Sequence, residues 1–292
     1  MLKHSFEVAT TPKRVVVIGA AGFVGGASVA RLRRYGAQVL GLSRADIDLS
    51  ADGAAARLAE MLQAGDTVVA VAARAPCKNI DMLIDNMKMV RTMLDAMKQV
   101  EISHLVNISS DAVYGDEPVP LTEGAPAAPG SLHGAMHLAR EIAFASAGIA
   151  PIAILRPTLV YGAADPHNGY GPNRFVRQAQ AGEPISLFGE GEERRDHVSV
   201  EDVAEIVARV VLRRSVGTLN IASGEIHSFA DAAKLAVAAT GSKSRLMLLP
   251  RTGPMPHNGY RPFDIAALKS AFPDLVPVHL VAGIKAMAGN AR

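Results

Sequence analysis

A glycine triplet near the start of the chain has the spacing of a phosphate-binding turn. Gly19, Gly22 and Gly25 form the run G-A-A-G-F-V-G. This run follows an apolar segment over residues 14–19 and precedes a helical pattern over residues 24–34. Glycine permits a tight turn and lets the backbone approach an anion, which also meets free N–H groups and the positive end of the helix dipole. The spacing therefore predicts a pyrophosphate-binding site at the start of this helix.

Two histidines, His133 and His137, are four residues apart in a segment with helical spacing. Side chains at positions i and i+4 lie on one face of a helix, so both imidazoles can serve one site. An imidazole titrates at about pH 6.5, so His133 can act as a base at neutral pH without a neighbouring cation. A protonated His137 would lower the pKa of His133. No Glu completes an H-E-x-x-H pattern, and we therefore expect no metal ion here.

Strands and helices that alternate along the chain must position these residues. Such alternation implies right-handed crossovers and a doubly wound parallel sheet, which is the α/β Rossmann architecture. Ligands in this architecture bind at the carboxyl ends of the strands. Short apolar runs predict strands at residues 14–19, 39–42, 66–73, 104–109, 152–155 and 218–221, and helical spacing predicts helices at 24–34, 54–63, 82–99, 133–147 and 198–212.

The amino-acid composition of the sequence changes after Tyr161. Residues 162–172 are rich in Gly, Pro, Asn and Asp, which is typical of a loop. We therefore expect a Rossmann domain built from residues 1–165 together with about 198–240. A smaller C-terminal substrate lobe is expected from about 166–197 together with 241–292.

The composition is that of a globular protein. The 292 residues are 49% hydrophobic and 20% charged, with a formal net charge of +2. Neither nucleic acid nor an anionic membrane is therefore an expected partner. The single cysteine, Cys77, cannot form an internal disulfide, which favours a reducing, cytoplasmic compartment. We find no signal peptide pattern and no apolar run of about 18 residues, so we expect no membrane span.

Further motifs continue after the glycine turn through most of the chain. They lie at residues 66–73 (D-T-V-V-A-V-A-A), 86–96, 107–115 (N-I-S-S-D-A-V-Y-G), 155–162 (L-R-P-T-L-V-Y-G), 195–202 (R-D-H-V-S-V-E-D) and 218–224 (T-L-N-I-A-S-G). Together these motifs resemble the extended branch of the short-chain dehydrogenase/reductase superfamily, the NAD(P)-dependent epimerase/dehydratase family that modifies nucleotide sugars. The resemblance covers roughly residues 13–285.

The resemblance implies an active site of Ser or Thr with Tyr-x-x-x-Lys. In this family the Tyr exchanges a proton with a substrate hydroxyl while a hydride moves to or from nicotinamide, and the Lys binds the nicotinamide ribose and lowers the pKa of the Tyr. Ser110 matches the catalytic serine, whereas His133 and His137 stand where the Tyr and the Lys are expected. Three interpretations stay open: the His pair supports proton transfer, the site binds ligand without chemistry, or another group substitutes.

The implied cofactor is NADP or NAD. An acidic residue at the end of the second strand would bind the adenosine ribose of NAD and repel the extra phosphate of NADP. Ser43 and Arg44 stand there instead, and a hydroxyl and a guanidinium suit a 2′-phosphate, so we predict a preference for NADP. A solvated surface role for Arg44 is the alternative. The predicted cofactor-binding residues are Gly19, Ala21, Gly22, Phe23, Val24, Gly25, Ser43, Arg44, Asp48, Leu49, Ala72, Ala73, Asn86 and Pro157.

The resemblance also implies a substrate site that uses both lobes. Arg195 matches the arginine that binds the diphosphate of the nucleotide sugar, although it could instead pair with neighbouring glutamates on a solvated face. Asp111 follows Ser110, but Ala112 stands where the dehydratases have Glu, which argues against dehydration. A turn or helix cap explains Asp111 equally well. The predicted substrate-binding residues are Asp111, Thr158, Asn173, Phe188 and Arg195.

We therefore expect an NAD(P)-dependent epimerase or ketoreductase that acts on a nucleotide sugar by hydride transfer. The alternative is a catalytically inactive NAD(P)-binding member of the same fold, a sensor or assembly subunit, which the absence of the Tyr and the Lys would allow. The resemblance further implies a homodimer formed by the helices around residues 82–99 and 133–147.

Overall fold

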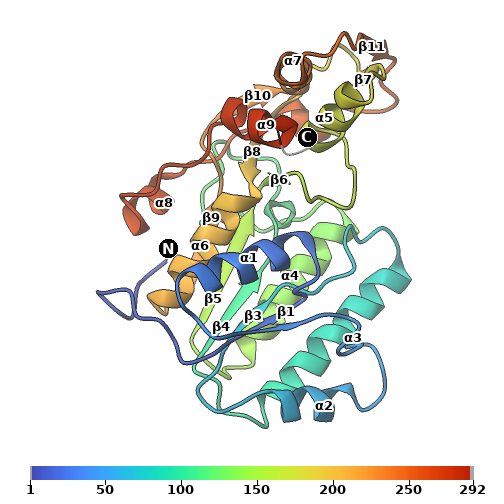
Figure 1. Ribbon diagram of the computed structural model, residues 1–292. Coiled ribbons are helices and arrows are strands. Elements are labelled where there is room, and N and C mark those ends of the chain that lie inside the picture. The colour runs from blue at the N-terminus through green and yellow to red at the C-terminus, as the bar shows by residue number, and fades with distance from the viewer. Residues whose placement is uncertain (1, 290–292) are drawn as a thin grey trace.

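A six-stranded parallel sheet forms the centre of the molecule, and the computed structural model describes residues 2–289 (Figure 1). The strands lie in the order β2-β1-β3-β4-β5-β9, and every neighbouring pair is parallel. This arrangement confirms the predicted doubly wound α/β fold. The strands are β1 (Val15–Ile18), β2 (Val39–Leu42), β3 (Thr67–Ala70), β4 (His104–Ile108), β5 (Ile152–Pro157) and β9 (Gly217–Ile221).

The strand order reverses at β1. Strand β2 pairs with one edge of β1 and β3 pairs with the other, so that Val15 lies opposite both Val39 and Thr67. Chain connections leave the two sides of β1 in opposite directions, and a crevice for ligands opens at the carboxyl end of such a strand. Gly19 follows that end directly.

Helices cover both faces of the sheet, which explains why its strands are continuously apolar. On one face α1 and α6 pack over Val15 and Val17. On the other face α2, α3 and α4 pack over Val16 and Ile18. Because side chains alternate along a strand, one apolar strand supplies both cores. The helices are α1 (Phe23–Arg34), α2 (Ala54–Met61), α3 (Ile80–Met97), α4 (Leu132–Ser146) and α6 (Val200–Leu212).

A second, smaller lobe lies above the sheet in the view of Figure 1. Helices α5, α7 and α9 share one apolar core with β7, which pairs with β11. Strand β8 pairs with β6, β10 and β12. No helix within residues 2–289 has both the length and the apolar character needed to cross a membrane. The remaining elements are η1 (Asp111–Val113), β6 (Leu159–Tyr161), α5 (Pro172–Gln180), β7 (Ile185–Phe188), β8 (Arg194–Ser199), β10 (Ile226–Ser228), α7 (Phe229–Thr240), β11 (Leu246–Leu249), η2 (Pro256–Gly259), β12 (Tyr260–Arg261), α8 (Ala266–Ala271) and α9 (Leu280–Gly289).

Two helices do not lie where the predicted lobe boundaries put them. Helix α7 falls within the stretch 198–240 that was assigned to the Rossmann domain, yet its Ala233 packs in the core of the second lobe. Helix α8 falls within the stretch 241–292 that was assigned to the substrate lobe, yet its Leu268 packs in the core of the sheet. The physical reason is that helical spacing indicates that one face of a helix is buried, and not which element buries it.

Candidate active site

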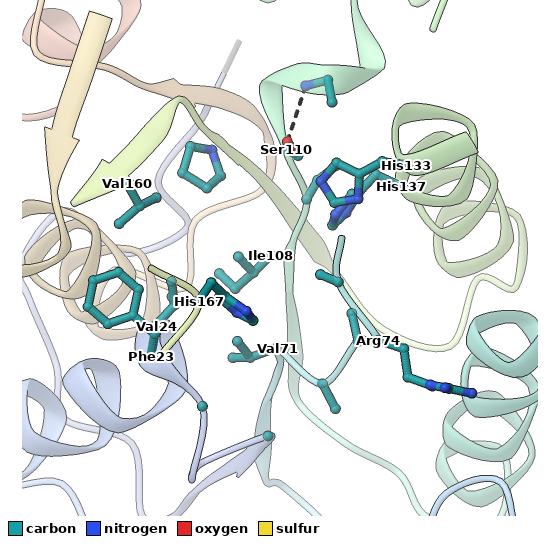
Figure 2. A pocket seen from close by; sticks show the side chains of 18 of the residues that line it. Phe23, Val24, Val71, Arg74, Ile108, Ser110, His133, His137, Val160 and His167 are labelled. Atoms are coloured by element: carbon teal, nitrogen blue, oxygen red, sulfur yellow. Dashed lines mark hydrogen bonds between the residues drawn. The ribbon is translucent and has the colours of Figure 1, made fainter. Parts of the chain in front are cut away.

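A cleft of about 1300 Å³ opens at the carboxyl ends of the sheet strands and extends toward the second lobe. Its wall contains the glycine turn after β1, the segments that follow β2 and β3, the start of α4, and Arg195 of β8. Figure 2 shows Phe23 and Val24 of α1 on one side of this space and His133 and His137 of α4 on the other. The cleft thus brings together residues predicted to bind cofactor, to bind substrate and to do chemistry.

The glycine turn is shaped by close backbone contacts. Gly19 has φ +100°, and a Cβ added there would lie 2.6 Å from the Ala72 nitrogen. A Cβ added to Gly25 would lie 2.1 Å from the Gly19 carbonyl oxygen. Gly25 does not line the cleft, so its function is to let α1 pack against the turn. The other predicted residues of this segment, Ala21, Gly22, Phe23 and Val24, do line the cleft.

The start of α1 is free to meet an anion. Gly22 occupies the N-cap position without a side-chain hydrogen bond, and no acidic residue stands in the first turn of the helix. Among residues 2–289, no side chain accepts a hydrogen bond from the N–H groups of this first turn. Together with the positive helix end, this cradle fits the pyrophosphate of a dinucleotide.

Two carboxylates shape the segment after β2. The Ser43 hydroxyl donates to Asp46 at 2.6 Å, and the Arg44 guanidinium pairs with Asp48 at 3.1 Å. Hydrogen bonds from Ser50, with a smaller contribution from Arg44, lower the pKa of Asp48 to about 2. Ser43, Arg44, Asp48 and Leu49 all line the cleft. Asp46 was not predicted to shape this segment, although Ser and Asp are both residues that favour turns.

The segment after β3 is tethered by α3. Ala72 and Ala73 line the cleft, as does Pro157 at the end of β5. Asn86 lies outside the cleft, because its side chain accepts a hydrogen bond from the Arg74 N–H at 2.9 Å and donates one to the Arg74 carbonyl at 3.1 Å. Asn86 therefore holds the cleft wall in place and does not itself face the cleft.

The two histidines lie side by side on α4. Their ring centroids are 4.7 Å apart and the rings are nearly perpendicular, at 85°. Ser110 lies near them in Figure 2, where its Oγ accepts a hydrogen bond from the Ala112 N–H at 3.1 Å. Helix α4 approaches this segment closely, since a Cβ added to Gly134 would lie 2.0 Å from the Ala112 carbonyl oxygen. This close approach is what brings Ser110 and the His pair to one part of the cleft.

The surroundings of both histidines disfavour the protonated form. Burial lowers the pKa of His133, although the negative charge of Asp111 opposes the change. Burial, and then the positive charges of a protonated His133 and of Arg140, hold the pKa of His137 well below its usual value. The Cys77 N–H donates to His133 Nδ1 over a long distance of 3.4 Å, and His137 Nδ1 is buried without a partner among residues 2–289. A neutral His133 can accept a proton at pH 7.

The predicted substrate residues divide between the cleft and its surroundings. Asp111, Thr158 and Arg195 line the cleft. Arg195 pairs with the neighbouring Glu193, with 3.5 Å between Arg195 Nε and Glu193 Oε1, but the two residues are only 9% and 6% exposed, so this ion pair is buried and not on a solvated face. Arg195 Nη1 is buried without a partner among the described residues. Asn173 lies outside the cleft, and its side chain accepts a hydrogen bond from the Gly162 N–H at 2.8 Å. Phe188 also lies outside the cleft and is 42% exposed.

A second buried arginine contacts the same wall and was not predicted. Arg261 of β12 donates to Asp111 at 3.1 Å and to Asp116 at 3.0 Å, and it is 1% exposed. Asp111 is therefore the partner of a buried cation in addition to standing in η1. In the sequence, Arg261 is simply one charged residue within the proline-rich tail, and nothing there marks it as a site residue. Its partner is 150 residues away in the chain, which no local pattern could indicate.

Tyr114 is not a ready replacement for the missing tyrosine at position 133. Tyr114 lines the cleft, but its hydroxyl donates to Asn220 at 2.7 Å and accepts from Arg156 at 2.8 Å. Burial raises the pKa of Tyr114. Within residues 2–289, no group of three or more His, Cys, Asp or Glu side chains is arranged to hold a metal ion.

Comparison with known proteins supports what the fold and the cleft suggest, a dinucleotide-binding Rossmann protein. A profile of the NAD dependent epimerase/dehydratase family matches residues 15–222. Because this match spans well over half of the chain, the protein belongs to that family.

Individual relatives agree with this assignment. A dTDP-4-dehydro-6-deoxy-D-allose reductase of Streptomyces bikiniensis is 26% identical over 279 residues, which is 82% of this chain and 84% of the relative. A UDP-glucose 4-epimerase of Corynebacterium glutamicum is 26% identical with the same coverage. The crystal structure of the Thermus thermophilus UDP-glucose 4-epimerase in complex with NAD shares the fold, with a TM-score of 0.84, 24% identity, and coverage of 94% of this chain and 98% of that chain.

Proposed function

We propose that this protein is an NAD(P)-dependent epimerase or ketoreductase that acts on a nucleotide sugar. One observation carries the proposal: a single cleft is lined by an uncovered helix start, by Ser110 with the neutral His pair, and by the partly unpaired Arg195. The first feature suits a dinucleotide, the second suits proton exchange and the third suits a diphosphate. The two curated relatives named above are a reductase and an epimerase of nucleotide sugars, which supports the same class of substrate.

The residues of the chain divide the work of such a reaction. The first turn of α1 binds the pyrophosphate of the dinucleotide, which when bound would supply or accept a hydride. Ser110 orients the hydroxyl or carbonyl oxygen of the sugar, and His133 exchanges the proton with that oxygen. Asp111 is engaged with Arg261 and is followed by Ala112, so this pair of positions lacks the acid needed to remove water.

We also propose that NADP is preferred over NAD. Ser43 and Arg44 follow β2 directly and both line the cleft. Arg44 is paired with Asp48, but its side chain is 82% exposed, and an exposed ion pair contributes little free energy. Release of Arg44 to a ligand phosphate would therefore cost little, and its planar guanidinium suits a phosphate.

A homodimer is a further part of the proposal. Helices α3 and α4 carry large apolar side chains that are exposed in a single chain: Ile80 is 58%, Ile84 48% and Ile142 59% exposed. Ile80 and Ile84 are four residues apart and share one face of α3. A second copy could cover these side chains.

The single cysteine supports a cytoplasmic location, because it excludes an internal disulfide.

The test of the function is a substrate panel. The purified protein is mixed with NAD, NADP or their reduced forms and with UDP- and dTDP-sugars or their 4-keto derivatives, and the products are separated by chromatography while cofactor absorbance is followed. Epimerised or reduced sugar in at least one reaction would support the proposal. Tight binding of dinucleotide with no conversion of any nucleotide sugar would instead indicate the inactive binding member.

A further inference from the structure

Arg140 is a buried charge one helical turn after His137 on α4. It follows His137 by three residues on α4 and is 1% exposed. Its Nε donates to the Asn107 side-chain oxygen at 2.7 Å, and its two Nη atoms donate to the carbonyl oxygens of Ala72 at 2.5 Å and Ala70 at 2.6 Å. Because Ala72 lines the cleft and Arg140 does not, the guanidinium is held on the far side of the cleft wall.

A second buried arginine, on the neighbouring sheet, has the carboxylate partner that Arg140 lacks. Arg156 of β5 forms a two-pronged ion pair with Glu141, at 2.9 and 2.6 Å. Glu141 also accepts the Ser109 hydroxyl, so this carboxylate, although next to Arg140 in sequence, is already used. Among residues 2–289, Arg140 donates hydrogen bonds only to neutral oxygens, and its guanidinium lies over the Phe144 ring, 5.4 Å from the ring centroid, so no carboxylate neutralises it. A buried charge without a charged partner destabilises the folded protein, so we looked for a function that would explain Arg140.

The immediate neighbour of Arg140 is the histidine at the lysine position of the family motif. Burial lowers the pKa of Arg140 only to about 10, so the guanidinium stays charged at neutral pH. Its charge opposes protonation of His137, as does that of a protonated His133. The other charged groups around the pair are Asp111, which faces His133, and the Glu141 carboxylate already neutralised by Arg156.

We propose that Arg140 supplies, from behind the wall of the cleft, the fixed positive charge that a lysine at position 137 would provide. Arg140 is then a positioning residue, and His137, kept neutral, is the group that meets the ligand. The charge acts across the wall because electrostatic interactions are weakly screened in a buried region. This inference rests on the proposed function, since the charge serves catalysis only if a dinucleotide occupies the cleft.

The first test compares Arg140→Lys with Arg140→Gln. Both variants keep a hydrogen-bond donor near the carbonyl oxygens, but only Lys keeps the charge. NMR of the His ring protons in cofactor-free protein reports the pKa of His137, and fluorescence titration reports the Kd of the dinucleotide. We expect Gln to raise the pKa of His137 and to weaken dinucleotide binding by about tenfold, and Lys to change both much less. Equal behaviour of the two variants in both readouts would overturn the proposal.

The second test moves the charge back to the helix position of the family lysine. His137→Lys in the Arg140→Gln background should restore the dinucleotide affinity that Arg140→Gln loses. His137→Lys alone should weaken binding or destabilise the protein, because it places two cations side by side. Tighter dinucleotide binding in that single variant would refute the idea that Arg140 already provides the charge. The single variant leaves the Arg140 hydrogen bonds intact, so it decides the matter even if Arg140→Gln does not fold.

Neither test depends on turnover of a sugar. If no nucleotide sugar is converted, the proposed function fails, while the pKa of His137 and the dinucleotide affinities still decide the role of Arg140. If sugars are converted and these readouts do not distinguish Lys from Gln, the proposal for Arg140 fails by itself.

Discussion

The two ends of the cleft are constrained in different ways. At the glycine turn, backbone atoms set the requirement, because a Cβ on Gly19 or Gly25 would collide with main-chain atoms. At the end that contains the His pair the backbone frame is equally tight, with Gly134 against Ala112, yet the side chains at 133 and 137 differ from the family pattern. A backbone frame can thus persist while the chemical groups it carries change. The backbone geometry predicts where ligands bind. Only the environment of the side chains predicts which chemistry the bound ligands undergo.

The most demanding test of this comparison is His133→Ala. If His133 exchanges the proton, kcat should fall by about 10² to 10⁴, the usual contribution of a general acid or base. The Kd of the dinucleotide should stay the same, because the glycine turn is untouched. Steady-state kinetics and a fluorescence titration measure the two quantities. His279→Ala, at an exposed site outside the cleft, is the matched control, and unchanged kcat in His133→Ala would remove His133 from the mechanism.

The backbone end of the comparison is tested by two neighbouring glycines of α1. Gly25→Ala should destabilise the fold by about 1–3 kcal/mol, because its Cβ cannot avoid the Gly19 carbonyl oxygen, and should weaken dinucleotide binding more than about tenfold. Gly26→Ala is the control, since its Cβ would lie at an ordinary 3.4 Å from the Ala20 oxygen. Alanine is the better helix former by about 1 kcal/mol, so this variant should be neutral or more stable. Thermal unfolding that ranks the two variants the other way would contradict this view of the turn.

The same distinction explains how much could be predicted from the sequence. The parallel sheet and the glycine turn could be predicted because buried strands and tight turns leave local patterns. Asn86 matched a family position, but its contact with the loop at Arg74 is a matter of tertiary packing. The pair of Asp111 with Arg261 depends on two lobes meeting across 150 residues. Ion pairs between residues so far apart in the chain leave no periodic pattern in the sequence.

The pH dependence of turnover sharpens the catalytic side of the comparison. In the direction that oxidises a sugar hydroxyl, His133 must be neutral to accept the proton. Because the pKa of His133 is lowered from 6.5, the ring stays neutral as the pH falls below that value, and activity in this direction is lost only when the pH falls through the lowered pKa. The acid limb of kcat/KM should therefore lie below pH 6.5. Asp111→Asn should move this limb to still lower pH, because the Asp111 charge raises the pKa of His133. An acid limb at or above pH 6.5 would show that another group limits the rate.

The smallest effect is expected at the exposed rim of the cofactor end, where neither backbone packing nor burial acts. Arg44→Ala should lower the ratio of NADP to NAD affinity by no more than about tenfold, since Arg44 is 82% exposed and its interactions are screened by water and salt. Titrations with both dinucleotides at low and high salt measure this ratio. The difference in the ratio between Arg44→Ala and the wild-type protein should become smaller as the salt concentration is raised. Arg34→Ala, on the last turn of α1 and away from the cleft, is the control for loss of a surface charge. If the ratio does not change in Arg44→Ala at low salt, the preference for NADP does not come from this arginine.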